Sequence, residues 1–281
     1  MTPPFVSGAL AERIERAEAN LTRVPVRVML AERPHSEAFV EEIAGGVAVY
    51  VAPYSPLNKL IGLGFAGLPH DEQLAGVEQK FQQRGAALQV EVCTLVDGAC
   101  FEYLSRRGYV LHGHENVLGR ALTDGDPLPA QRNPAIEVRP ALPEELPSWI
   151  EADVTASLCP DEQGALPDLP AREPLLETMQ LFARAPDFQR YIARIDGELA
   201  GVAELRLDDG IAQLCGAATL PHFRRRGVQT QLLQQRLADA REAGAELAVM
   251  TAQPGSKSQE NALRVGFSLL YCRANLVRSP R

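Results

Sequence analysis

Three consecutive arginines and a glycine, residues 224–227, stand directly before a segment of helical periodicity in TLPHFRRRGVQTQLL. A helix N-terminus leaves backbone N–H groups without intrahelical partners and carries the positive end of the helix dipole. A glycine there lets a bulky anion approach the amides with no Cβ in the way, and arginines add charge-assisted hydrogen bonds to phosphate oxygens. This order of residue types predicts a site for a pyrophosphate group.

The segments around this turn are predicted to be a strand before it and an amphipathic helix after it. IAQLCGAAT, residues 211–219, has the composition of a strand, and residues 228–243 place their apolar side chains on one helical face. Downstream, ELAVMT is typical of a buried strand and SQENALRV of a short helix. Upstream, the dipeptide Asp196-Gly197 between two strand patterns predicts a hairpin. The turn is therefore expected at the end of a strand in a mixed sheet.

From residue 136 to residue 277, the sequence resembles the GNAT superfamily of acyl-CoA-dependent N-acyltransferases. The turn is similar to that family's coenzyme A pyrophosphate motif, which has Arg or Gln, then Gly three residues later, then Gly or Ala two residues after that. Arg224, Gly227 and Gln229 hold these positions, and Gln229 departs from the usual small residue. The resemblance implies that coenzyme A contacts Arg224, Arg225, Arg226, Gly227, Val228, Gln229 and Thr230.

Two further segments carry the resemblance. SQENALRVGF is similar to the family's helix that lies along the pantetheine arm, which implies a hydrogen bond from Asn261 to the cofactor chain. In the family fold, the strand before the turn splays from its neighbour and pairs with the pantetheine. That contact falls here on the backbone of Ala217, Ala218 and Thr219. Acetyl-CoA is the co-substrate that the resemblance implies, and no metal is implied.

The implied reaction is direct attack of a primary amine on the acyl thioester, catalysed by an N-acetyltransferase. It needs a deprotonated amine, a backbone N–H for the oxyanion and, optionally, an acid for the thiolate. Many family members place a tyrosine acid where this chain has Ala262, and Tyr271 is the nearest substitute. Some use a glutamate base on the splayed strand, where this chain has Gln213; Glu204 on the preceding strand is the candidate. A small molecule is the expected acceptor, and a peptide N-terminus or lysine is the alternative.

The N-terminal half repeats the plan of the C-terminal half. LPHDEQLAGVEQKF begins 152 residues before LPHFRRRGVQTQLL, and the dipeptide Gly108-Tyr109 lies 158 residues before Gly266-Phe267. A period this long equals a domain, so two copies of one fold are expected. The resemblance implies the α/β (α+β) class, with a mixed, mostly antiparallel twisted sheet flanked by helices in each GNAT-like domain.

The predicted domains are residues 1–130 and 134–281. The polar segment 123–134 is the expected linker between them, and the proline-rich segment 165–174 is an expected loop. At the first domain's equivalent turn, Asp71 and its neighbour Glu72 would repel a pyrophosphate, so no cofactor site is expected there. That domain is expected to shape the acceptor pocket as a pseudo-dimer partner, within a monomer or a homodimer.

Two other functions stay open. IGLGFAG contains the G-x-G-x-x-G of dinucleotide-binding proteins and has Glu91 on the next predicted strand, so an NAD(P)-binding oxidoreductase is the second class of function. Against this, Pro69, Asp71 and Glu72 follow the glycines and bring acids towards any pyrophosphate. A non-catalytic sensor of acyl-CoA is the third possibility, because the usual tyrosine acid is missing.

Composition excludes several classes of protein. A net charge of −8 over 281 residues argues against a general nucleic-acid binder, because phosphate neutralisation needs clustered Lys and Arg. Five cysteines without a C-x-x-C pair favour neither a disulfide framework nor a zinc site. The N-terminal segment lacks the pattern of a signal peptide, and no apolar run reaches the length of a membrane span. These features predict a cytoplasmic protein with neither nucleic acid nor membrane as a partner; the small-molecule amine substrate is what the resemblance implies.

Overall fold

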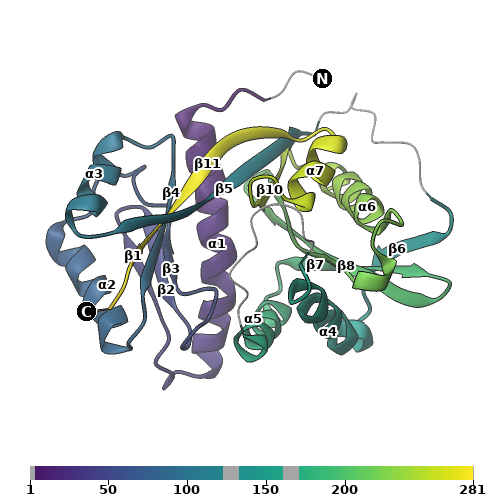
Figure 1. Cartoon of the computed structure of the whole chain (residues 1–281), viewed down its shortest axis with the longest axis horizontal. Coiled ribbons are helices and arrows are strands. Elements are labelled where there is room, and N and C mark those ends of the chain that lie inside the picture. Colours follow the sequence, from purple (N-terminus) through teal and green to yellow (C-terminus); the bar gives the residue numbers. More distant parts are fainter. Residues whose placement is uncertain (1–3, 123–132, 161–170, 281) are drawn as a thin grey trace. The chain divides into compact units, whose positions relative to one another are not determined.

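The computed structural model describes residues 4–122, 133–160 and 171–280, which form two compact units (Figure 1). The expected linker 123–134 lies outside the described residues except for its last two positions. Most of the expected loop 165–174 also lies outside them, and its last three residues already belong to helix α5. No helix in the described ranges is both long and apolar enough to cross a membrane.

The first unit contains the described residues of Asn116–Arg172 and Pro186–Leu270, with the described part of 1–5. Its strands lie in the order β5-β10-β9-β8-β7-β6, and all recorded pairings are antiparallel except the parallel pairing of β9 with β10. The strands are β6 (Ile136–Pro140), β7 (Phe188–Ile195), β8 (Glu198–Asp208), β9 (Ile211–Thr219), β10 (Leu247–Ala252) and the second half of β5 (Val110–Ala121).

Helices cover both faces of this sheet, as Figure 1 shows. Trp149 of α4 packs with Val202 of β8 on one face, whereas Leu232 and Leu237 of α6 pack with Ala203 of β8 on the other. Because side chains alternate along a strand, neighbouring residues of β8 face different helices. The helices and short 3-10 turns of this unit are η1 (Pro143–Glu145), α4 (Leu146–Ser157), η2 (Pro221–Phe223), α6 (Val228–Glu242) and α7 (Lys257–Arg264).

The predicted apolar face of α6 is confirmed. Its apolar side chains are almost fully buried because they lie at helical spacing and meet the sheet together. They are Val228, Leu232, Leu233, Leu237 and Ala240. The helix ends before Gly244, whose φ of 79° lies in the left-handed region that glycine adopts without a steric penalty.

The second unit contains residues Val6–Glu115, Glu173–Ala185 and the described part of Tyr271–Arg281. Its strands lie in the order β1-β2-β3-β4-β11, with a parallel pairing only between β3 and β4 among those recorded. The elements are α1 (Gly8–Glu32), β1 (Phe39–Ile43), β2 (Gly46–Tyr50), β3 (Lys59–Ile61), α2 (Asp71–Gln83), β4 (Leu88–Cys93), α3 (Gly98–Arg106), α5 (Arg172–Arg184) and the second half of β11 (Ser268–Arg278).

The two units share one plan, and the predicted fold class is confirmed. In each, two antiparallel hairpin steps are followed by a helix that connects a parallel pair of strands, then by a shorter helix. Helix α2 corresponds to α6 in this order, and α3 corresponds to α7. Parallel strands need a crossover connection, which explains why these helices keep their place in both copies.

The compact units do not follow the predicted division into residues 1–130 and 134–281 at their last strands. Residues 116–121 of β5 pair with β10 in the first unit, and residues 273–278 of β11 pair with β4 in the second. The last strand of each unit therefore begins in the other unit: β5 begins in the second unit and ends in the first, and β11 begins in the first and ends in the second. Hydrophobic periodicity within a strand does not identify its partner strand, so the sequence contains no signal of this exchange.

A buried ion pair organises the second unit. Glu15 of α1 and Arg273 of β11 are both about 1% exposed, and their charged groups approach to 2.8 Å. The Tyr271 hydroxyl donates a hydrogen bond to Glu15 Oε1 over 2.7 Å. Glu115 lies 3.4 Å from Arg273 and Glu91 lies 3.9 Å from it. This cluster attaches α1 to the strand that completes the sheet.

We expect Glu15→Ala to lower the free energy of unfolding by about 3 kcal/mol, because removing one partner of a buried pair leaves the other charge uncompensated. Urea unfolding followed by circular dichroism measures this change. Glu12→Ala removes an exposed carboxylate from the same helix and serves as the control. Equal stability of the two variants would contradict the structural role of the cluster.

Candidate functional site

Strand β9 separates from β10 halfway along its length. The parallel register ends with the pair Gln213↔Val249, whereas β9 continues to Thr219 and β10 to Ala252. The separation leaves the β10-facing edge of residues 214–219 available to another extended chain, which is a recurrent way for proteins to bind one. The expected splay of this strand is therefore present in the structure.

A β-bulge lies at the point of separation. Across the β8–β9 pair, Val202 faces Ala218 and Glu204 faces Cys215, so β9 contains one extra residue between them. Gly216 has a φ of 51° there, and a Cβ at this position would lie 2.9 Å from Glu204 Oε2. A side chain at position 216 would thus displace the Glu204 carboxylate.

Arg236 of α6 holds this bulge from the opposite face of the sheet. Its side chain is fully buried, and one guanidinium nitrogen donates to the carbonyl oxygens of Glu204 at 2.9 Å and Cys215 at 3.1 Å. Burial lowers the pKa of Arg236 to about 10. The sequence pattern gave no sign of this role, because an arginine on an amphipathic helix is more often exposed.

The arginine turn connects β9 to α6. Gly227 is the N-cap of α6 with a φ of 90°, and neither a side-chain cap nor an acidic residue occupies the first turn. Arg225 also has a positive φ, 62°, which an arginine adopts only at an energetic cost. The N-terminal amides of α6 therefore have no competing anion from their own helix.

Arg224 binds the protein backbone as well as lining the cavity described next. Its guanidinium donates to the carbonyl oxygens of Thr219 and Ala156 at 3.3 Å each, and to that of Cys159. These bonds attach the turn to the C-terminal end of α4. Arg226 differs, because its guanidinium lies 5.4 Å from the centre of the Phe223 ring.

A cavity of about 890 Å³ lies beside the turn. Every residue predicted to contact coenzyme A lines it except Arg226. Lys257 and Arg264 of α7 add positive charge to its wall, and both also pair with Glu260. The predicted contacts in the lining are Ala217, Ala218, Thr219, Arg224, Arg225, Gly227, Val228, Gln229, Thr230 and Asn261.

One buried polar atom in the cavity wall suits a ligand. Thr219 Oγ1 is inaccessible to solvent and has no hydrogen-bond partner among the described residues. Leaving such a group unsatisfied costs about 1–3 kcal/mol, so an unpaired hydroxyl is expected where a ligand completes the site. The splayed strand edge, the uncapped helix and the basic lining fit an extended molecule with a phosphorylated end.

Neither of the two predicted catalytic residues lines the cavity, and only Glu204 belongs to the same compact unit as the cavity. Its side chain is about 3% exposed, and Arg190 Nε donates to it over 3.1 Å. Burial raises the pKa of Glu204 to about 7, although Arg190 opposes the rise. Such a carboxylate is suited to accept a proton near neutral pH.

Tyr271 lies in the second unit and is about 4% exposed. Burial, together with the charge of Glu15, raises the pKa of its phenol far above the ordinary value. Its hydroxyl is part of the cluster with Glu15 and Arg273, and it does not line the cavity beside the turn. Ala262, the position of the tyrosine acid in many relatives, is fully buried.

The equivalent positions of the second unit are occupied by the protein itself. Helix α2 starts with Asp71 and Glu72 and has a capping box formed by His70 and Gln73. Asp71 accepts hydrogen bonds from Tyr103 and Arg107. Its carboxylate is therefore held at the N-terminus of α2, where a bound phosphate would otherwise lie. Strand β3 ends at Ile61, where its pairing with β4 also ends, and no splayed edge follows.

The glycine-rich segment has a packing role in this unit. It does not open a helix, because β3 ends at Ile61 and α2 starts only at Asp71. Gly64 has a φ of 104°, and a Cβ there would lie 3.0 Å from the Val96 side chain. Glu91 is about 1% exposed and paired with Lys59 at 2.9 Å, which removes the acid that the oxidoreductase hypothesis requires.

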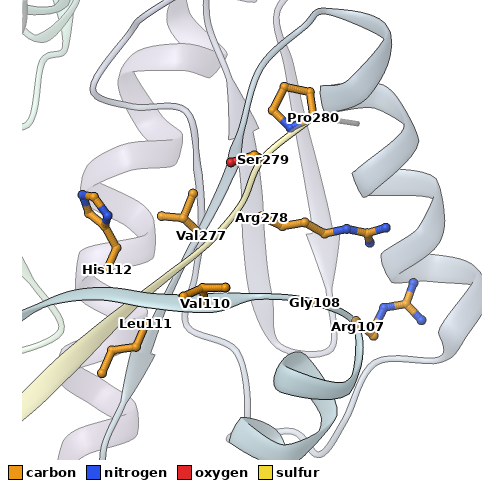
Figure 2. Close-up of a pocket in the computed structure, with 9 residues that line it drawn as sticks. All are labelled: Arg107, Gly108, Val110, Leu111, His112, Val277, Arg278, Ser279 and Pro280. Carbon is orange, nitrogen blue, oxygen red and sulfur yellow. The ribbon is translucent and has the colours of Figure 1, made fainter.

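A second cavity, of about 430 Å³, lies in the second unit and is drawn in Figure 2. Arg107 and Arg278 line it, but both bind Glu78, at 2.8 Å and 2.5 Å. His112 also lines it, from strand β5. The described residues contain no group of three or more His, Cys, Asp or Glu side chains that could hold a metal ion.

Comparisons with known proteins agree with this geometry. Residues 152–267 match the model of the Acetyltransferase (GNAT) family. No curated protein matches the chain. A GCN5-related N-acetyltransferase from Kribbella flavida has a similar structure, with a TM-score of 0.63 at 19% identity over 93% of this chain and 96% of that one.

Two other solved structures are similar over nearly the whole chain. A GCN5-related N-acetyltransferase from Sphaerobacter thermophilus gives a TM-score of 0.59 at 15% identity, covering 100% of this chain and 98% of that one. A tandem GNAT protein from the clavulanic acid biosynthesis pathway gives 0.60 at 12% identity, covering 98% and 97%. At such low identity these likenesses concern the fold, which is that of a chain with two GNAT-like domains. The family match supplies the activity class: residues 152–267 form an acetyltransferase domain of the GNAT family.

Proposed function

We propose that this protein transfers the acetyl group of acetyl-CoA to a primary amine, and that the acceptor is a small molecule. The observation that carries the proposal is the cavity of the first unit. It brings together a splayed strand edge, an uncapped helix N-terminus, arginines and the unpartnered hydroxyl of Thr219. Few ligands other than coenzyme A combine a peptide-like arm with a pyrophosphate.

The pyrophosphate and the pantetheine arm of acetyl-CoA would each meet matching groups in the cavity. The pyrophosphate would lie on the amides of Val228, Gln229 and Thr230, where the helix dipole favours negative charge. The pantetheine would extend along β9 past Ala217 and Ala218, and Asn261 of α7 would bind its amide groups. Bound acetyl-CoA supplies the thioester that the amine attacks.

The chain's own groups would perform proton transfer and stabilise the transition state. Glu204 would accept a proton from the acceptor ammonium, directly or through water, because its raised pKa matches neutral conditions. A backbone N–H of the bulge in β9 would stabilise the oxyanion. Thiolate is a good leaving group, so this scheme does not depend on Tyr271.

The second unit would serve a structural purpose towards the acceptor site, as the pseudo-dimer partner of the first. The acids at the start of α2 and the absence of a splayed edge after β3 support this role, because neither feature suits a pyrophosphate. The chain would therefore have one site for acetyl-CoA, and one copy of the chain would be sufficient to form it.

We expect Arg225→Glu to weaken acetyl-CoA binding about tenfold, because the substitution places a negative charge in the wall of a site for pyrophosphate. Isothermal titration calorimetry measures the dissociation constant. Arg226→Glu makes the same charge change one residue further on, outside the cavity lining, and should weaken binding about threefold or less. Equal losses in both variants would argue against the proposed pyrophosphate contact.

The same titration should give a stoichiometry of one acetyl-CoA per chain. Asp71→Arg replaces an acid at the start of α2 with a residue that attracts phosphate. It should leave that stoichiometry unchanged, because β3 offers no free edge for the pantetheine. Two equivalent sites in the wild-type protein would contradict the assignment of the second unit as a copy without a cofactor site.

A further inference from the structure

Two buried carboxyl groups lie together on the α4 face of the first unit's sheet. Asp153 of α4 is about 4% exposed and Glu204 of β8 about 3%, and the charge of Glu204 acts on Asp153. Arg190 donates to Glu204 over 3.1 Å. The rest of the layer that α4 and the sheet enclose contains the apolar residues Trp149, Ala152, Ala156, Ile192, Val202 and Ala218. Burying carboxyl groups among such side chains is unfavourable, so their presence indicates a role other than packing.

The pair lies next to the cavity rather than remote from it. On β8, Glu204 is two residues from Val202 and thus faces α4, and its carboxylate is in contact with the bulge at Gly216. The next residue of β9, Ala217, lines the cavity. On α4, Asp153 is one helical turn before Ala156, which also lines the cavity.

Helix α4 has a fixed position on the sheet. The Trp149 indole nitrogen donates to the carbonyl oxygen of Tyr191 over 2.9 Å, within the buried layer. Because Asp153 follows Trp149 by one turn, this bond also fixes the position of Asp153 towards β8. The position of Asp153 on the sheet is therefore a property of the folded unit.

The groups around the pair make the two carboxyls unequal. Arg190 of β7 and Arg236 of α6 lower the pKa of Glu204, against a larger rise from burial, and the resulting value is about 7. Asp153 has no arginine among the causes of its shift: burial and the charge of Glu204 raise its pKa to about 8. Cys215 lies opposite Glu204 on β9. Because the Arg190 guanidinium pairs with Glu204 at 3.1 Å, the negative charge of the pair is favoured on Glu204 and the shared proton on Asp153.

We propose that Asp153 is a positioning residue that holds a proton beside Glu204, so that the pair presents a single negative charge to an acceptor that binds as an ammonium ion. This inference rests on the proposed acetyl transfer. The acceptor R–NH3⁺ gives one proton to the Glu204 carboxylate, and the free amine attacks the thioester carbon. As the C–S bond breaks, the second nitrogen proton goes to the thiolate, and Glu204 later returns its proton to water. Asp153 is unchanged over the cycle.

The pH dependence of kcat/KM tests the pair. For wild type, we expect a rise through an apparent pKa near 7, as Glu204 loses its proton, and a fall through one near 8, as Asp153 loses its own. Asp153→Asn keeps a neutral polar group, so it should retain activity at pH 7.5 within about threefold and lose the alkaline fall. Glu204→Gln should lower kcat about 100-fold, the usual cost of losing a general base. The probes are n-butylamine, phenethylamine, lysine and spermidine, and the most active of them is used throughout.

Glu151→Gln is the matched control. Glu151 lies on the same helix two residues before Asp153, is 56% exposed in its side chain and pairs with Arg172. Glu151→Gln should keep both the rise of kcat/KM near pH 7 and its fall near pH 8. If the fall of kcat/KM at alkaline pH persists in Asp153→Asn, or disappears in Glu151→Gln, the proposed role of Asp153 is overturned.

Difference infrared titration of the carboxylic C=O stretch provides a readout that does not require an acceptor. Between pH 6 and pH 9, wild type should lose two buried protonated carboxyl bands, and Asp153→Asn and Glu204→Gln should each lack one. In Glu204→Gln, the remaining band should titrate at lower pH, because the charge that raises the pKa of Asp153 is gone. A set of carboxyl bands in Asp153→Asn identical to that of wild type would refute the inference.

The failure of the inference is distinguishable from that of the proposed function. Without acetyl-CoA binding in calorimetry, or without acetylation of any probe amine, the proposed function fails, whatever the infrared bands are. With acetyl-CoA bound and amine acetylated, an unchanged pH profile in Asp153→Asn defeats only the inference. Thermal unfolding of each variant shows whether its fold is retained.

Discussion

The candidate site depends on the early separation of β9 from β10. Parallel strands in an open sheet usually continue side by side, but here pairing stops at Gln213 while both strands extend further. The bulge at Gly216 turns the β9 edge, and the buried guanidinium of Arg236 satisfies the carbonyl oxygens that the bulge exposes. Without that charge-assisted support, an interrupted ladder inside a packed unit would leave buried polar groups unpaired.

Two consequences follow from this separation. The splayed edge ends at a turn whose left-handed Gly227 starts α6 without a cap, so extended backbone and helix amides line one cavity. On the α4 face, the same bulge leaves room for the Glu204 carboxylate at the position where a side chain on residue 216 would stand. One irregularity of a single strand thus shapes both the wall of the cavity and the surroundings of the Glu204 carboxylate.

The second unit is informative by contrast. It keeps the order of strands, the parallel crossover and the helix, because these form its core. It lacks the splayed edge, and its own acids and capping box occupy the start of α2. Its buried charges serve a different purpose, since Glu15 and Arg273 connect α1 to the strand that completes the sheet. The fold has therefore been retained in a copy from which the features of the site are absent.

The sequence by itself determined the local features of this protein: the strand before the arginine turn, the apolar face of α6, the left-handed glycine and the repetition of the plan. These depend on residue type and on spacings of two or of three to four residues, which are visible along one chain. Only the tertiary structure decided that residues 273–278 complete the other unit's sheet, that Tyr271 belongs to a cluster with Glu15, and that Arg236 and Asp153 are buried beside Glu204. Strand partners, burial and electrostatic neighbours arise between residues distant in sequence, and no local pattern contains them.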